Sequence, residues 1–124
     1  MEKLKILFVD DEEELVSTLV ERLEFRDINA VYELNGASAI ERLRKEKFNI
    51  VILDLKLPGI SGKETLRVIN QEHARLPVIL ITGHLSATEQ HEVPKGAADY
   101  LTKPINIDDL IEKINDVLSG HERE

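Results

Sequence analysis

The chain has no cysteine, no tryptophan and few aromatic side chains, with three Phe and two Tyr among 124 residues. Without cysteine it has no disulfide framework, no thiolate metal site and no cysteine nucleophile. With so few rings it has no aromatic platform on which nucleic-acid bases could stack. Long hydrophobic runs are missing too, since the apolar stretch near the amino terminus covers only residues 6–9. A signal peptide or a membrane span needs more, so we expect a cytoplasmic protein without a membrane partner.

Acidic residues outnumber basic ones by 24 to 16, which gives a net charge of −8. That charge argues against direct nucleic-acid binding by this domain. The length fits one domain with its own core. We expect the domain to span residues 1–120. The polar residues 121–124 are then either the start of a linker to an output domain or the end of a stand-alone protein, and we favour the first. The four histidines have no compact ligand spacing, which argues against a zinc site.

Short runs rich in Val and Ile alternate with segments of helical periodicity along the whole chain. Such runs are typical of parallel strands that are buried on both faces. The alternation predicts a doubly wound α/β fold with five βα units and helices on both faces of the sheet. The expected strands cover residues 6–9, 30–34, 50–53, 78–82 and 98–102, and the clearest helix runs from Ile107 to about residue 118. The apolar residues of this helix form one stripe that we expect to pack on the sheet: Ile107, Leu110, Ile111, Ile114, Val117 and Leu118.

The segment between Gly83 and Gly96 fits this pattern least well. A crossover helix is needed there, because parallel strands cannot be joined by a short turn. The segment has few apolar anchors, however, and Pro94 should end any helix by about Glu92. We therefore expect a short and weakly packed helix at this point.

Polar residues follow four of the expected strands: Asp10 and Asp11, Asp54, Thr82, and Lys103. Each one alone has a simple structural explanation, as a helix cap, a turn residue or a solvated lysine. In an open parallel sheet, however, ligands bind at the carboxyl ends of the strands. Carboxylates gathered there repel one another unless a cation joins them, and their hard oxygens suit Mg²⁺. The joint occurrence predicts a phosphate-handling site.

The chain resembles the receiver domain of two-component response regulators over residues 4–119. The motifs are VDDE at residues 9–12, LDL at 53–55, LPG at 57–59 with Gly62 behind it, ITG at 81–83 and GAADYLTKP at 96–104. The wording of the last two motifs is most similar to receivers that precede transcriptional activators. The resemblance implies a flavodoxin-like (βα)5 fold with a five-stranded parallel sheet in the order 2-1-3-4-5. It also implies a signalling domain rather than an enzyme.

The resemblance implies that Asp54 is the phosphoacceptor. It would take a phosphoryl group from a sensor histidine kinase, a phosphotransfer protein or a small donor. Asp10, Asp11, Asp54 and the backbone carbonyl of Lys56 would hold Mg²⁺, with Mn²⁺ as a possible substitute.

Two further residues would contact the phosphoryl oxygens, Thr82 through its hydroxyl and Lys103 through its ammonium group. A Lys-Pro pair such as Lys103-Pro104 can use a cis bond to aim the side chain. Tyr100 matches the aromatic switch residue of the family. The switch would act on the face made by the helix after Gly83, the strand 98–102 and the helix from Ile107, and so control an output domain or partner, including through a phosphorylation-dependent homodimer.

One segment departs from the family pattern, and two residues are candidates for tuning the chemistry of the site. The stretch from Thr82 to Lys103 is one residue shorter than is usual in receivers, so we expect altered docking through the helix in that stretch. Lys56 and His84 lie two residues after Asp54 and Thr82. In the receivers that the chain resembles, these positions flank the water that hydrolyses the acyl phosphate. Both are candidates for tuning the phosphoryl lifetime.

Three other functions are open for these residues. A small Mg²⁺-dependent phosphatase would use Asp54 or Asp10 as nucleophile, but it needs a cap for which 124 residues leave no room. A flavodoxin-like cofactor binder would need a Gly-rich phosphate loop after the first strand, where Asp10 and Asp11 stand instead. A phosphorylation-independent interaction module would have the same fold but would not accept a phosphoryl group. The presence of all the expected site residues argues against it: Asp10, Asp11, Asp54, Thr82 and Lys103.

Overall fold

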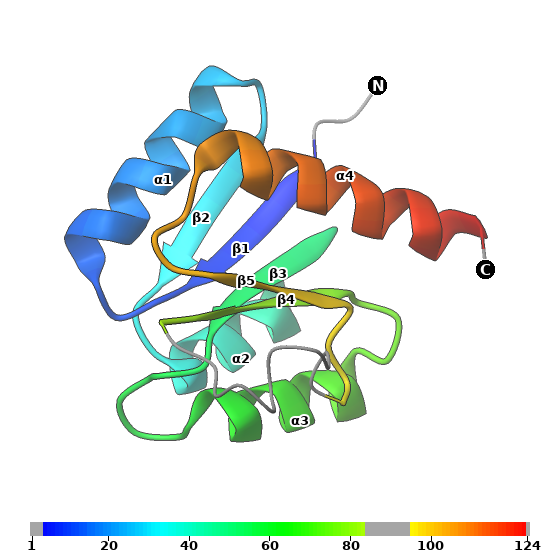
Figure 1. Cartoon of the computed structure of the whole chain (residues 1–124). Helices are drawn as coiled ribbons and strands as arrows, with labels where there is room; N and C mark the ends of the chain where they lie inside the picture. The colour runs from blue at the N-terminus through cyan, green and yellow to red at the C-terminus, as the bar shows by residue number, and fades with distance from the viewer. Residues whose placement is uncertain (1–3, 84–94, 124) are drawn as a thin grey trace.

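The computed structural model describes residues 4–83 and 95–123, and only the backbone of residues 121–123. Within these ranges the chain forms five strands and four helices (Figure 1). The helix expected between Gly83 and Pro94 lies outside the described residues, so the helix from Ile107 is labelled α4. The strands are β1 (Lys5–Val9), β2 (Asn29–Glu33), β3 (Ile50–Asp54), β4 (Val78–Thr82) and β5 (Asp99–Thr102); the helices are α1 (Glu13–Phe25), α2 (Gly36–Lys45), α3 (Gly62–Glu72) and α4 (Ile107–Arg123).

All five strands are parallel and form one sheet in the order β2-β1-β3-β4-β5. The expected fold class and strand order are therefore confirmed. The chain winds outward from β1 to β2, then crosses back to β3 and continues to the opposite edge. The order reverses between β1 and β3, and ligands bind at such a switch point in open α/β sheets.

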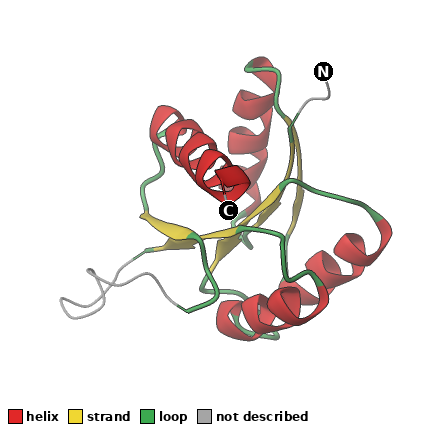
Figure 2. Cartoon of the chain, turned by 90° about the vertical axis from the view of Figure 1, so that its right-hand side faces the viewer, coloured by secondary structure: helices red, strands yellow, loops and turns green. Residues whose placement is uncertain are grey.

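Two layers of helices enclose the sheet, as the side view in Figure 2 shows. α1 and α4 pack with one core cluster, and α2 and α3 pack with the other. Alternate residues of β1 supply both clusters, since Ile6 and Phe8 belong to the first and Leu7 and Val9 to the second. Residues of β3 and β4 are buried throughout, which explains why their sequences are continuously apolar until the last position.

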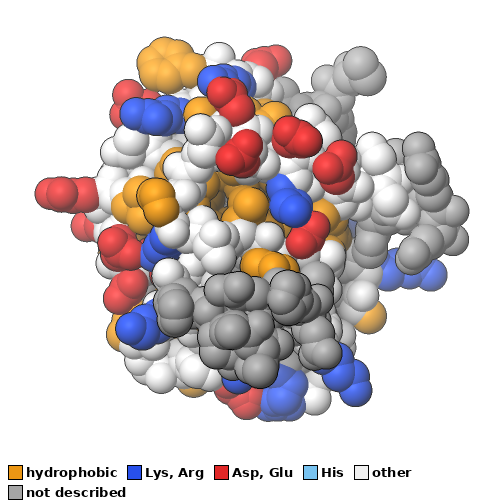
Figure 3. Space-filling view, viewed as in Figure 1, with side chains coloured by type: hydrophobic (Ala, Val, Ile, Leu, Met, Phe, Trp, Pro, Cys, Tyr) orange, Lys and Arg blue, Asp and Glu red, His pale blue; other side chains and the backbone are white. Residues whose placement is uncertain are grey.

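The predicted amphipathic stripe on the last helix is borne out, because Leu110 and Ile114 on α4 are fully buried. The opposite side of α4 is acidic, and Figure 3 shows acidic side chains gathered over this helix. Lys113 forms an ion pair with Asp99 of β5 at 3.1 Å, which ties the outer side of α4 to the edge strand.

Two helix starts are capped by side chains that the sequence places there. Asn35 Oδ1 accepts the N–H of Ser38 at 2.9 Å at the start of α2, and Ser61 Oγ accepts the N–H of Glu64 at 3.1 Å at the start of α3. The strand expected over residues 30–34 is shifted by one residue, since it ends at Glu33. Leu34 leads from that strand into the extended Asn35 cap.

No helix in the described ranges is both long enough and apolar enough to cross a membrane.

The parallel register fixes which strand ends are neighbours. Val9 of β1 is paired with Leu53 of β3, so Asp10 and Asp54 lie side by side at the carboxyl edge of the sheet. At the other side of β3, Thr82 of β4 is paired with Thr102 of β5. Lys103 follows directly, and its backbone N–H donates to the carbonyl of Thr82 at 2.9 Å.

Gly62 at the start of α3 lies so close to the end of β3 that a side chain has no room. A Cβ at this position would lie 2.5 Å from Leu55 Cα and 2.6 Å from the carbonyl oxygen of Asp54, both backbone atoms. Gly120, in contrast, has nothing within 4 Å of its Cβ position. The loop after Asp54 therefore depends on the close approach of Gly62.

We expect Gly62→Ala to lower the free energy of unfolding by about 1–3 kcal/mol, the usual cost of overpacking. The matched control Gly120→Ala lies on an exposed position of α4 and should raise it by about 0.5–1 kcal/mol through helix propensity. Urea denaturation, monitored by circular dichroism, measures the free energy of unfolding of both variants. Equal effects of the two substitutions would show that the loop tolerates a side chain at residue 62.

Candidate functional site

A pocket of about 510 Å³ opens at the carboxyl edge of the sheet, above the ends of β1, β3 and β4. It lies at the switch point between β1 and β3, where the sequence analysis expected a site. It is lined by Asp11, Glu12, Asp54, Lys56, Leu57, Pro58, Gly83 and Lys103.

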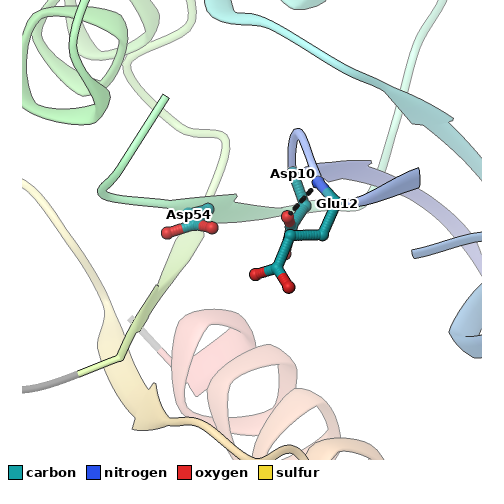
Figure 4. A group of neighbouring side chains, drawn as sticks. All are labelled: Asp10, Glu12 and Asp54. Atoms are coloured by element: carbon teal, nitrogen blue, oxygen red, sulfur yellow. Dashed lines mark hydrogen bonds between the residues drawn. The ribbon is translucent and has the colours of Figure 1, made fainter. Parts of the chain in front are cut away.

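Three carboxyl groups meet in this site, from Asp10 after β1, Glu12 before α1 and Asp54 at the end of β3 (Figure 4). One oxygen of each lies within 4.8 Å of the others. Asp10 is fully buried and Asp54 is 2% exposed. Burying two carboxylates at neighbouring strand ends is costly unless cations or hydrogen-bond donors compensate.

Asp10 is only partly compensated. Its Oδ1 accepts the backbone N–H of Glu12 at 2.9 Å. Its Oδ2 is buried and receives no hydrogen bond from the described residues, although Lys103 Nζ lies at an ion-pair distance of 3.3 Å. Burial raises the pKa of Asp10 above its ordinary value, and the charge of Asp54 adds to the rise, against the N–H of Glu12 and the charge of Lys103.

Asp54 uses its two carboxylate oxygens differently. Oδ1 accepts the backbone N–H of Lys56 at 3.0 Å, which fixes the orientation of the carboxyl group. Oδ2 accepts a hydrogen bond from Lys103 Nζ at 3.0 Å. Asp54 lines the pocket, so this carboxylate is both oriented and reachable from solvent.

Lys103 bridges all three carboxylates. Its ammonium group forms ion pairs with Asp10, Glu12 and Asp54. Burial alone would lower the pKa of Lys103, but its hydrogen bonds to Glu12 and Asp54 and the charge of Asp10 outweigh burial and raise it. Lys103 therefore stays protonated at neutral pH. The Lys103–Pro104 peptide bond is cis, the geometry that the sequence analysis considered.

The structure brings Asp10, Asp54 and Lys103 together at one edge of the sheet, and Asp11 lines the pocket beside them. Asp11 is exposed and lines the pocket without joining the close group of carboxylates. The hydrogen bond from the Glu12 N–H to Asp10 Oδ1 turns the chain at this point. Glu12 is the third carboxylate of the close group with Asp10 and Asp54.

Glu12 was expected only as part of the VDDE motif, without a role in the site. The one local signal is its position two residues after Asp10, because the Glu12 N–H can then close a turn onto the Asp10 carboxylate. Its partner Lys103 is 91 residues away, and that separation gives no local pattern to detect.

The other expected residues lie around this centre. Thr82 ends β4 and is 7% exposed. Tyr100 on β5 is half-buried against the cluster that α2 and α3 share. Lys56 lines the pocket, whereas His84 lies outside the described residues.

The residues present fit a hard divalent cation. Asp10 Oδ2 is a buried oxygen without a hydrogen-bond donor among the described residues, and carboxylate oxygens are the ligands that Mg²⁺ prefers. Asp10 and Asp54 supply such oxygens from rigid strand ends, and Glu12 and Asp11 lie at the open side.

Fold and pocket together define a doubly wound α/β domain with an acidic, lysine-bridged site at the carboxyl edge of its sheet. The chain belongs to the response regulator receiver domain family, whose family model matches residues 6–115. It is 35% identical over 119 residues to YkoG of Bacillus subtilis (strain 168), an uncharacterized transcriptional regulatory protein, covering 95% of this chain and 52% of YkoG. The chain thus spans about half the length of YkoG.

Solved structures agree with this assignment. The receiver domain protein (CheY-like) of Methanospirillum hungatei JF-1 superposes with a TM-score of 0.89 at 28% identity, and 98% of each chain is covered. The response regulator TrrA of Thermotoga maritima, solved in complex with Mg²⁺ and BeF, gives a TM-score of 0.82 at 30% identity, covering 92% of this chain and 98% of that one.

We expect Asp10→Asn to raise the free energy of unfolding of the metal-free protein at neutral pH by about 1 kcal/mol, the lower end of the cost of a poorly compensated buried polar group. The sign follows from the raised pKa of Asp10, because its ionisation opposes folding. Wild type therefore loses stability as pH rises from 3.8, the ordinary pKa of an aspartate, through the raised pKa of Asp10 in the folded protein. The difference between the two proteins should grow across this window.

With Mg²⁺ present, wild type should have the higher free energy of unfolding of the two proteins. Mg²⁺ stabilises wild type by binding at Asp10 and binds more weakly to the variant. Urea denaturation with Mg²⁺ or with a chelator measures both effects. A variant that gains as much stability from Mg²⁺ as wild type would contradict the assignment of Asp10 as a ligand.

Proposed function

We propose that this receiver domain is a phosphorylation-dependent switch in which Asp54 accepts a phosphoryl group with the help of Mg²⁺. The donor is the phosphohistidine of a sensor histidine kinase or phosphotransfer protein, or a small phosphodonor. The observation that carries the proposal is the state of Asp54. Its carboxylate is oriented by the Lys56 N–H, paired with Lys103 and open to the pocket.

In the transfer, an oxygen of Asp54 forms a bond to phosphorus while the bond from phosphorus to the leaving atom of the donor breaks. The leaving group keeps the electron pair, and no proton has to move at Asp54. Such transfers depend on position and charge neutralisation rather than on covalent help from the protein. Lys103 supplies a fixed positive charge beside Asp54, and Asp10, Asp11, Asp54 and the carbonyl of Lys56 are the groups that would hold the cation. Bound Mg²⁺, or Mn²⁺ in its place, would neutralise the phosphoryl oxygens.

The switch then follows from the added charge. A phosphoryl group on Asp54 carries strong acceptor oxygens, which the hydroxyl of Thr82 and the ammonium of Lys103 can contact. Tyr100 lies on β5 and Lys103 follows directly after this strand, so a shift at the site can move the β5–α4 face. Lys56, at the pocket, and His84 are the residues proposed to tune how long the phosphoryl group persists.

The readout is an output domain or a separate partner protein. YkoG carries the name of a transcriptional regulatory protein and is about twice the length of this chain, which supports an output domain that acts in transcription. The net charge of −8 supports leaving DNA contacts to that other part. We further propose that the protein works in the cytoplasm and that phosphorylation favours a homodimer.

The test is incubation with acetyl phosphate and Mg²⁺, followed by intact mass measurement. Wild type should gain one phosphoryl adduct, because acetate leaves as Asp54 attacks. Asp54→Asn should gain none, since an amide is a poor nucleophile, and a chelator should slow the reaction of wild type strongly.

Asp99→Asn is the matched control, because Asp99 is an acid on β5 that pairs with Lys113 outside the pocket. It should react like wild type. A phosphoryl adduct that persists in Asp54→Asn would move the acceptor to another residue.

A further inference from the structure

Glu12 occupies the position before α1 but does not cap the helix. Its side chain makes no capping hydrogen bond to the first turn, which is the usual use of an acidic side chain at this place. It turns instead across the pocket and pairs with Lys103. The two residues come from opposite ends of the chain, so this contact exists only because the sheet brings β1 and β5 loops to one edge.

The ammonium group of Lys103 is surrounded by carboxylates. It donates hydrogen bonds to Glu12 and Asp54 and forms an ion pair with Asp10 at 3.3 Å. A phosphoryl oxygen that is to pair with Lys103 must therefore compete with these groups.

Glu12 is the group most easily replaced. Asp10 is fully buried, and its carboxylate is fixed by the N–H of Glu12. Asp54 is itself the residue that gains the phosphoryl group. The side chain of Glu12 is 58% exposed, and Lys103 is its partner among the described residues. It can therefore turn into water without leaving a buried charge behind.

We propose that Glu12 is a competing counterion, which holds Lys103 in the unphosphorylated site and must be displaced by the phosphoryl group. The inference rests on the proposed function and deepens it. Glu12 then acts through Lys103, as a positioning residue that slows phosphorylation and weakens the binding of phosphoryl analogues. It also adds negative charge near the cation site, so its effect on Mg²⁺ has the opposite sign.

The substitution Glu12→Gln removes the competitor and keeps the length of the side chain. At saturating Mg²⁺, the affinity for beryllofluoride and the rate of phosphorylation by acetyl phosphate should both rise by about two- to fivefold, the range expected for a partly exposed ion pair. The affinity for Mg²⁺ alone should fall, because the substitution removes a negative charge near the cation site. Titration calorimetry measures the two affinities, and intact mass measures the rate.

Glu14→Gln is the matched control for charge. Glu14 is an exposed acid in the first turn of α1, two residues from Glu12, and makes no ion pair with Lys103. It should leave all three quantities unchanged. Glu12→Asp separates contact from charge, because aspartate is shorter and favours capping the helix. Its phosphorylation rate and beryllofluoride affinity should therefore resemble those of Glu12→Gln rather than those of wild type.

The outcomes separate this inference from the proposed function. Equal rates and beryllofluoride affinities in wild type and Glu12→Gln, with a normal adduct on Asp54, overturn the role of Glu12 alone. So does a Glu12→Asp variant that behaves like wild type, since charge rather than contact would then be the cause. Absence of adduct and of beryllofluoride binding in wild type overturns both. Opposite shifts for beryllofluoride and Mg²⁺ in Glu12→Gln, with no shifts in Glu14→Gln, support the inference, and a merely structural role would not produce them.

Discussion

Lys103 holds the site together, because it is the cation that lets two carboxylates be buried at adjacent strand ends. Asp10 and Asp54 are neighbours as a consequence of the β1–β3 register, and neither can move away without breaking the sheet. Their mutual repulsion would be severe in a buried setting, and the ammonium group at 3.3 and 3.0 Å offsets it. One buried oxygen of Asp10 still lacks a hydrogen-bond donor among the described residues, so the compensation is incomplete. That incomplete compensation makes the site receptive to a divalent cation.

The sheet makes this arrangement rigid. Its three central strands are almost entirely apolar and buried, and helices cover both faces. The polar groups of the site are confined to the one edge where the strands end and loops begin. Asp54 and Thr82 are the last residues of their strands, and Asp10 and Lys103 follow directly after theirs. Charges held in fixed positions need no reorganisation when a charged group enters the site.

Much of the fold was predictable from sequence, because the patterns that specify it are local. The runs 50–53 and 78–82 are continuously apolar and form central strands, and the stripe that includes Leu110 and Ile114 is buried on α4 as expected. The strand expected over residues 30–34 lies one residue earlier, because it pairs with β1 from Asn29 opposite Lys5 to Glu33 opposite Val9. Strand ends are decided by such pairing partners, which a period of two residues does not show.

By itself the sequence determined the alternation of strands and helices, the acids and the lysine at the strand ends, and the family to which they point. These features depend on residue type and spacing within a few positions. Only the tertiary structure decided which carboxylates meet. Glu12 lies close to Asp10 and Asp54, while the exposed Asp11 lines the same pocket. The contact between Glu12 and Lys103 joins residues 91 positions apart, and its existence depends on the relative placement of two loops on one sheet edge. No local pattern encodes that placement, because it arises from the packing of the whole domain.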